Sequence, residues 1–157
     1  MPGYETDTVT RIETNLDDIS PQVLGSVMQK LLAAGALDVW FTPVQMKKNR
    51  PGTMLSALCE EDAGERLADI IFAETTAFGL RVESIRRLKL ARRFETVRTR
   101  HGEVTVKLGF NGERLLQIAP EFESCRALAE QVGITLREIH FAAIEAARAA
   151  FGENGAD

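Results

Sequence analysis

A basic stretch, Met46–Thr53, carries the residues whose types and spacing point most directly to chemistry. It reads Met-Lys-Lys-Asn-Arg-Pro-Gly-Thr and lies between two apolar runs. Lys47, Lys48 and Arg50 can form charge-assisted hydrogen bonds with phosphate oxygens. Gly52 can take a positive φ, which lets a ligand approach the main-chain N–H groups. The stretch therefore predicts a polyphosphate or other anion site, and a basic hairpin loop facing solvent is the alternative. It is not a Walker loop, because the Gly-x4-Gly-Lys-Ser/Thr order is absent.

A pair of acids, Asp17 and Asp18, follows a predicted strand at 9–14 and precedes a predicted helix. Hard divalent cations such as Mg²⁺ and Mn²⁺ take carboxylate oxygens and commonly share substrate phosphates with them. Acids just before a helix also stabilise it through the helix dipole. From these residues alone we favour the dipole role for one acid and leave metal binding open for the other.

Two adjacent threonines, Thr75 and Thr76, end a second predicted helix. Their hydroxyl groups can hydrogen-bond a ligand, or they can cap the helix and turn the chain, which is more common. Arg81 begins an arginine-rich segment that can line a phosphate channel or an oligomer interface. These residues are therefore further candidates for an anion site.

The composition restricts the class of protein. The 157 residues suffice for one domain or two small subdomains. A hydrophobic fraction of 45% with 27% charged residues is typical of a soluble globular chain, and a net charge of -4 does not favour nucleic acid as a partner. We expect no membrane segment and no signal peptide. Cys59 and Cys125 form no CxxC motif, which favours free thiols in the cytoplasm. Two histidines are too few for the usual imidazole–thiolate zinc or nickel site.

The first half of the chain predicts a ferredoxin-like sandwich. Ser20 is a good N-cap, Pro21 fits the first helical turn and Gly35 suits the position after the helix. A second helix is expected from Asp62 to Thr75. The expected strands are 9–14, 37–44, 53–59 and 80–90. The resulting order, β-α-β-β-α-β, is that of the ferredoxin-like fold.

The second half predicts a β-meander followed by two helices, so the whole chain is expected to be α+β. The strands are expected at 94–100, 103–110 and 114–119, with Asn111-Gly112 as a type I′ turn. The helices are expected at 122–132 and 135–151. We place the subdomains at 8–90 and 91–151 and expect residues 1–7 and 152–157 to be disordered.

Several blocks of sequence resemble one family in the same order along the chain. These blocks are Glu13–Pro21, Ala34–Val39, Met46–Thr53, Glu74–Thr76 with Gly79–Arg81, Arg93-Phe94 and Pro120–Cys125. Together they resemble the nickel-insertion protein of nickel-pincer cofactor synthesis, the LarC family. The resemblance implies a CTP-dependent enzyme of the lyase class that inserts nickel into pyridinium-3,5-bisthiocarboxylic acid mononucleotide. The product is the cofactor of lactate racemase.

The resemblance also implies the role of the candidate site. We expect it to bind CTP with Mn²⁺ or Mg²⁺, with the two carboxylates of Asp17 and Asp18 on the metal. The nucleotide and phosphate ligands are then Lys47, Lys48, Asn49, Arg50, Gly52, Thr53, Thr75, Thr76 and Arg81. The family has a further N-terminal region, often with a histidine-rich tract, that this sequence lacks. We therefore expect a C-terminal portion, excised or separately encoded, that binds nucleotide without complete activity.

A second hypothesis comes from a different class of function. Small ferredoxin-like domains often assemble through their sheet edges, so the chain is alternatively a non-catalytic oligomerisation or nucleotide-sensing module. The alanine-rich helix at 135–151 and the arginine-rich strands favour a homo-oligomer under either hypothesis.

Overall fold

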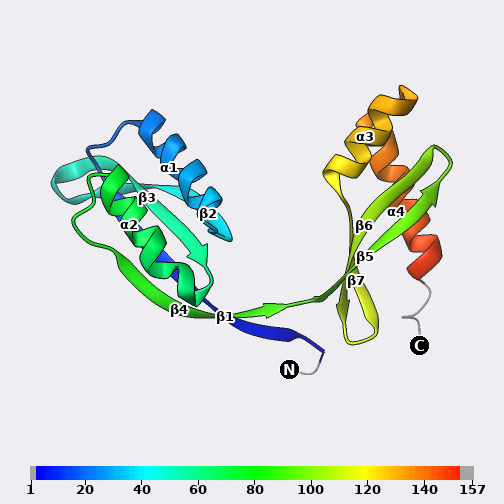
Figure 1. Cartoon of the computed structure of the whole chain (residues 1–157), viewed down its shortest axis with the longest axis horizontal. Helices are drawn as coiled ribbons and strands as arrows, with labels where there is room; N and C mark the ends of the chain where they lie inside the picture. The colour runs from blue at the N-terminus through cyan, green and yellow to red at the C-terminus, as the bar shows by residue number, and fades with distance from the viewer. Residues whose placement is uncertain (1–2, 153–157) are drawn as a thin grey trace. The chain divides into compact units, whose positions relative to one another are not determined.

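A four-stranded sheet with two helices on one face forms the first unit of the structure, Thr6–Arg87 (Figure 1). The computed structural model describes residues 3–152. The sheet order is β2-β3-β1-β4, and β3 pairs antiparallel with both β1 and β2. The elements are β1 (Glu5–Leu16), α1 (Pro21–Ala33), β2 (Asp38–Met46), β3 (Arg50–Cys59), α2 (Gly64–Glu74) and β4 (Arg81–Lys89). The predicted ferredoxin-like arrangement is confirmed.

Local signals set the ends of α1 as predicted. The Ser20 hydroxyl accepts a hydrogen bond from the Gln22 N–H at 3.2 Å, and Pro21 opens the helix. Gly35 follows the helix at φ 96°, a backbone conformation that costs glycine little. These three residues therefore set where α1 begins and ends.

The start of β1 differs from the prediction. The strand begins at Glu5, before the expected start at Val9, so it includes residues that we had assigned to a disordered start. The Asp7 carboxylate accepts two hydrogen bonds from the Arg87 guanidinium, at 3.0 and 2.7 Å, which ties this polar segment to β4. The hydrogen bond to Asp7 also raises the pKa of Arg87. The predicted disorder at 1–2 and 153–157 lies outside the described residues.

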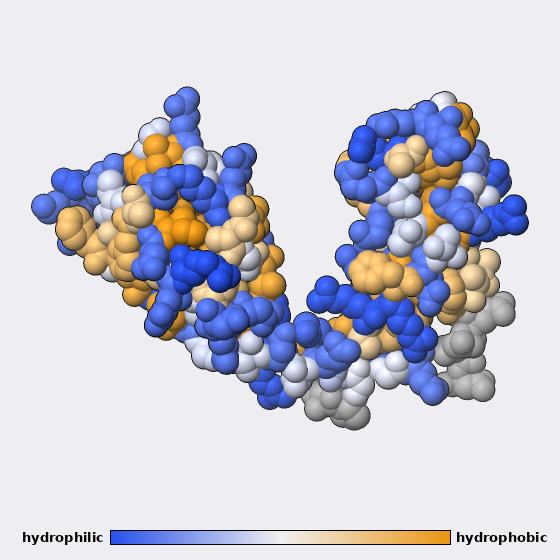
Figure 2. Space-filling model, in the orientation of Figure 1, coloured by the Kyte–Doolittle hydropathy of each residue, from blue (hydrophilic) through white to orange (hydrophobic). Residues whose placement is uncertain are grey.

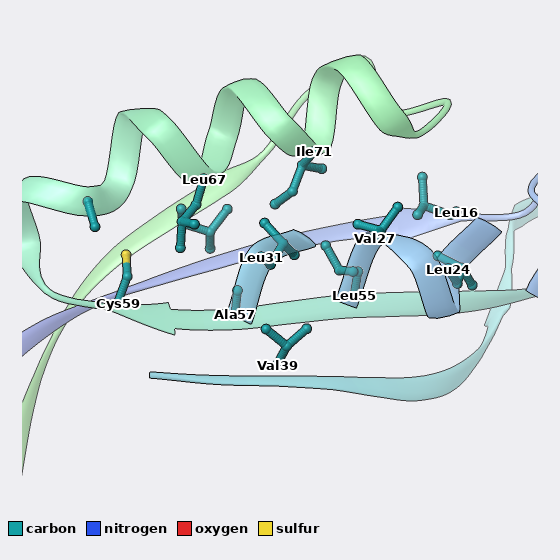
Figure 3. Packing of buried hydrophobic residues seen from close by; sticks show 12 residues of the cluster. Leu16, Leu24, Val27, Leu31, Val39, Leu55, Ala57, Cys59, Leu67 and Ile71 are labelled. Atoms are coloured by element: carbon teal, nitrogen blue, oxygen red, sulfur yellow. The ribbon is translucent and has the colours of Figure 1, made fainter. Parts of the chain in front are cut away.

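The core of the first unit lies between the sheet and the two helices (Figure 3). Alternation along β3 turns Leu55 and Ala57 toward the helices and Ser56 toward the opposite face. The buried members of this core are Ile12, Leu16, Leu24, Val27, Leu31, Val39, Leu55, Ala57, Cys59, Ala63, Leu67 and Ile71. On the opposite face, Ser56 pairs with Glu13 in the strand register and donates a 3.2 Å hydrogen bond to its carboxylate.

The second unit begins at Leu88 and, within the described residues, also includes residues 3–5. It consists of a meander, β5-β6-β7, against which two helices pack (Figure 1). The elements are β5 (Ala91–Thr99), β6 (Gly102–Asn111), β7 (Arg114–Pro120), α3 (Phe122–Val132) and α4 (Leu136–Phe151). The predicted meander and helices are confirmed.

Two details of the second unit differ from expectation. Asn111 pairs with Arg114, so the β6–β7 turn consists of Gly112 and Glu113, and of these only Gly112 has a positive φ. A type I′ turn needs two such residues, so that turn type was wrong. In α4, Ala143 and Ala147 are fully buried in the unit's own core. They therefore give no support to self-association.

Both cysteines lie in the interior. Cys59 and Cys125 are free, fully buried thiols, one in each unit. Burial raises the pKa of each thiol, and the charge of Glu60 adds to the effect at Cys59. The cysteines are thus structural residues. Over residues 3–152, none of the helices has the length and apolar character to cross a membrane.

Candidate functional site

The basic stretch forms a short hairpin turn, and the two strands that flank it are longer at this end than predicted. Strand pairing continues to Met46 and Arg50, so the turn consists only of Lys47–Asn49. Lys48 and Asn49 both have positive φ, 60° and 56°. The Asn49 side-chain oxygen accepts a 3.0 Å hydrogen bond from the Gln45 amide, and both lysines are exposed. The hairpin therefore presents its two lysines to solvent.

Gly52 does not have the positive φ that the sequence predicted. It lies within β3 and is not among the residues with positive φ, so that part of the prediction was wrong. A Cβ atom at this position would lie 2.8 Å from the main-chain oxygen of Leu16 and 2.7 Å from the sulfur of Met46. Glycine is thus required because the end of β1 passes close to β3. This close approach sets where the chain leaves β1 toward Asp17.

The acid pair links β1 to two other segments. Asp17 and Asp18 lie in the bend between β1 and α1. One Asp17 oxygen is 3.3 Å from a guanidinium nitrogen of Arg50, at the start of β3. The Asp18 carboxylate accepts a hydrogen bond from the Thr76 hydroxyl, in the loop after α2. Residues far apart in sequence therefore meet at the end of β1.

The two threonines after α2 have different hydrogen-bond partners. Thr75 donates to the Ile71 carbonyl at 2.7 Å and accepts from the Ala77 N–H at 3.1 Å, which caps the helix and turns the chain. Thr76 instead points to Asp18. The capping alternative thus describes Thr75, and the hydroxyl of Thr76 reaches the bend that contains Asp17 and Asp18, called the acid loop below.

Arg81 lies beside the end of β1 on the face of the sheet opposite the helices. Its guanidinium donates a 2.6 Å hydrogen bond to the Asn15 side chain and lies 3.7 Å from the Glu13 carboxylate. Glu13 is also 3.4 Å from Arg11, and its side chain is only 14% exposed. The positive charge of Arg81 is therefore held next to the acid loop by neutral and negative partners.

Two cavities flank the end of β1, and Leu16 and Asp17 line both. The larger, about 560 Å³, is lined by Thr14, Asn15, Leu16, Asp17, Asp18, Met46, Thr76, Ala77, Phe78, Gly79 and Arg81. The other, about 410 Å³, is lined by Leu16, Asp17, Ile19, Pro21, Leu24, Gly25, Phe41, Pro51, Gly52 and Thr53. The structure thus brings six predicted site residues to the larger cavity or its neighbour: Asp17, Asp18, Gly52, Thr53, Thr76 and Arg81. The hairpin beside the larger cavity carries four further predicted residues, Lys47, Lys48, Asn49 and Arg50. Thr75 caps the end of α2.

The acid loop offers only part of a metal coordination sphere. Within residues 3–152, no group of three or more His, Cys, Asp or Glu side chains is placed to hold a metal ion. Asp17 and Asp18 supply two hard carboxylates at one cavity. This set fits Mg²⁺ or Mn²⁺, which bind through one or two carboxylates plus substrate phosphates and water, rather than an all-protein cage.

Sequence reasoning missed several lining residues. Asn15 and Gly79 stood inside the blocks that carried the family resemblance, so their presence there was the available signal. Met46 stood inside such a block as well, whereas Phe78 lies between two blocks and gave no signal of its own. The position of Phe78 at the cavity follows from tertiary contacts alone.

The fold and these contacts define a two-unit α+β protein with a ferredoxin-like first unit. A family model described as nickel insertion protein matches residues 1–140. A relative in Syntrophotalea carbinolica, which carries the name of a nickel insertion protein, is 47% identical over 151 residues, or 96% of this chain and 38% of that protein. The pyridinium-3,5-bisthiocarboxylic acid mononucleotide nickel insertion protein of Thermotoga sp. strain RQ2 is 41% identical over 139 residues, or 88% of this chain and 34% of that protein.

A solved structure agrees with these matches. It is described as LarC2, the C-terminal domain of a cyclometallase involved in the synthesis of the NPN cofactor of lactate racemase, in the apo form. It matches with a TM-score of 0.83 and 42% identity, over 90% of this chain and 98% of that one. The chain belongs to the nickel insertion protein family, and the predicted resemblance to the LarC family is confirmed. It spans between 34% and 38% of the length of these two curated relatives.

Proposed function

We propose that this chain is the CTP- and divalent-metal-binding domain of a nickel insertase. The carrying observation is that the acid loop, Thr76 and Arg81 line one cavity beside the basic hairpin, in a chain of the nickel insertion family. The reaction served is CTP-dependent insertion of nickel into pyridinium-3,5-bisthiocarboxylic acid mononucleotide, of the lyase class. Nickel is the inserted metal and is therefore a substrate.

In this proposal the positively charged side chains bind the triphosphate of CTP. Arg50 and Arg81 are positioned by contacts with Asp17 and Asn15, at 3.3 and 2.6 Å. Lys47 and Lys48 are exposed on the adjoining turn, so their flexible side chains can follow the phosphates. The hydroxyl groups of Thr53 and Thr76 and the main chain at Asn49 and Gly52 complete the proposed phosphate ligands.

The acids take the metal in this proposal. Asp17 and Asp18 would ligate Mn²⁺ or Mg²⁺, and the bound cation would neutralise part of the negative charge of the phosphates. Thr76 donates to Asp18 and Arg50 contacts Asp17, so both carboxylates are already oriented at the cavity. The further N-terminal region implied by the family, as part of the same protein, is the proposed place of nickel capture. A cytoplasmic location remains a prediction, motivated by the two free thiols.

Binding of CTP with Mn²⁺ is expected to stabilise the chain against heat. By linkage, free ligand at about 100 times its Kd adds about 2.7 kcal/mol to the free energy of unfolding. Thermal melts with CTP and Mn²⁺ measure this, with ATP and Mn²⁺, and CTP in EDTA, as controls. An unchanged melting temperature at millimolar CTP and Mn²⁺ would contradict the proposed function.

We also expect the chain to self-associate. Apolar residues reach the surface in both units (Figure 2). Among the exposed large hydrophobic side chains are Val82, Phe94 and Phe122, at 61%, 62% and 60% exposure. Covering them removes apolar surface from water. Light scattering after size exclusion is expected to show more than one chain per particle. A 17.3 kDa particle at all concentrations tested would rule this out.

A further inference from the structure

Phe78 is the most exposed large hydrophobic side chain among residues 3–152, at 104% relative exposure. It lies in the loop between α2 and β4 and lines the 560 Å³ cavity together with Asp17, Asp18 and Arg81. A phenylalanine ring gains much from burial, so full exposure beside a polar cavity needs an explanation.

The loop around Phe78 is anchored on both sides. The Ala77 N–H donates to the Thr75 hydroxyl at 3.1 Å, and the Gly79 carbonyl accepts from the buried Thr14 hydroxyl at 3.0 Å. Thr76 is held by Asp18. The ring is therefore presented at the cavity by a backbone fastened to β1 and α2.

The cavity lining divides into a charged part and an aromatic part. Asp17, Asp18 and Arg81 suit phosphates and a divalent ion, whereas Phe78 is the one aromatic residue among the lining side chains described. A nucleotide has the same division, with a charged phosphate end and a flat heteroaromatic ring. Aromatic side chains bind such rings by stacking, which needs an exposed π-face.

We propose that Phe78 stacks on the heteroaromatic ring of the nucleotide bound at this cavity. The inference rests on the proposed nucleotide function and adds the group that holds the ring. It requires no movement of the acid loop, because the ring and the carboxylates already line one space. The ring bound is that of the cytosine base or that of the pyridinium mononucleotide, which share this chemistry.

Calorimetric titrations into the parent and Phe78→Ala test the proposal. Three probes are used, each with Mn²⁺: CTP, nicotinic acid mononucleotide as a pyridinium ring, and tripolyphosphate, which has no ring. Phe78→Ala is expected to weaken binding of CTP, of the pyridinium probe or of both by about 5- to 150-fold, with tripolyphosphate unchanged. The probe that loses affinity identifies the ring. Phe72→Ala, which removes a 46% exposed phenylalanine of α2 outside the cavity lining, is the matched control.

A second variant reports stacking directly. Trp40 is the only tryptophan of the chain, so Phe78→Trp adds one fluorophore at the cavity. Its emission is expected to be quenched by the ring-containing probe and not by tripolyphosphate, relative to the parent.

The two proposals fail in distinguishable ways. A parent that binds neither CTP nor tripolyphosphate overturns the proposed function. A parent that binds CTP, with Phe78→Ala binding every probe equally well, overturns the stacking inference alone. Equal losses for tripolyphosphate and CTP also overturn it, because the loop rather than the ring would then be responsible. So does a change in oligomeric state of Phe78→Ala with unchanged CTP binding, since a second copy would then cover the ring.

Discussion

Lys48→Ala and Asp18→Ala are each expected to weaken CTP binding about ten- to a hundred-fold, but under different conditions. Losing a charge-assisted hydrogen bond costs about 1.5–3 kcal/mol, which corresponds to this range. Lys48 supplies a point charge to the phosphates, so its loss should weaken binding with and without metal. Asp18 acts through the divalent ion, so its loss should matter only when that ion is present.

Titrations of CTP into each variant, in EDTA and in Mn²⁺, separate these effects. Lys48→Gln serves as a second variant, because it keeps most of the side-chain length at a position with φ of 60°. The controls remove equal charges from the same unit: Lys30→Ala, whose side chain pairs with Glu74 at 2.6 Å, and Asp69→Ala, which is exposed on α2.

Either variant can refute its own assignment. If Asp18→Ala binds Mn²⁺–CTP like the parent, the acid pair serves to stabilise the N-terminus of α1 through the helix dipole, and the metal is held by phosphates alone. If Lys48→Ala and Lys48→Gln both bind CTP normally, the basic hairpin is not the phosphate site.

Leu55→Ala is expected to lower the free energy of unfolding by about 2–5 kcal/mol, the usual cost of a buried leucine truncated to alanine. Leu55 is fully buried in β3, between the sheet and the side chains of both helices (Figure 3). Its truncation removes apolar contacts from the cluster that joins the sheet to the two helices and leaves a cavity in the core.

Urea denaturation followed by the fluorescence of Trp40 measures this loss. Trp40 lies on β2, so the signal reports on the unit that contains Leu55. Leu37→Ala is the matched control, because Leu37 is 45% exposed in the same unit and its truncation should change stability by no more than about 0.5 kcal/mol. Equal unfolding midpoints for the two variants would show that Leu55 is not part of the core.

The sequence by itself determined the order of elements and most of their ends. Ser20, Pro21 and Gly35 act through the backbone within a few residues of themselves, and Thr135 caps α4 by accepting from the Glu138 N–H at 3.3 Å. Alternation and helical periodicity are equally local, since they depend only on which face of an element is buried. The family resemblance came from the same source, as ordered blocks of residues.

The tertiary structure alone decided what several of those residues do. Gly52 is constrained by the carbonyl oxygen of Leu16, on another strand, and not by its own φ. In the early part of β1, which starts at Glu5, Asp7 accepts hydrogen bonds from Arg87 of β4. Neither contact follows from neighbours in sequence, because strand pairing brings together segments separated by whole helices.

The candidate site shows the same division. The types of Asp18, Thr76 and Arg81 marked them as candidates, but their meeting at the end of β1 required the sheet order β2-β3-β1-β4. The exposure of Phe78 is the feature of the site that the sequence predicts least, because an aromatic residue beside a helix end normally enters the core. Its loop is anchored by hydrogen bonds of Thr14, Thr75 and Thr76, and the ring lies exposed at the cavity.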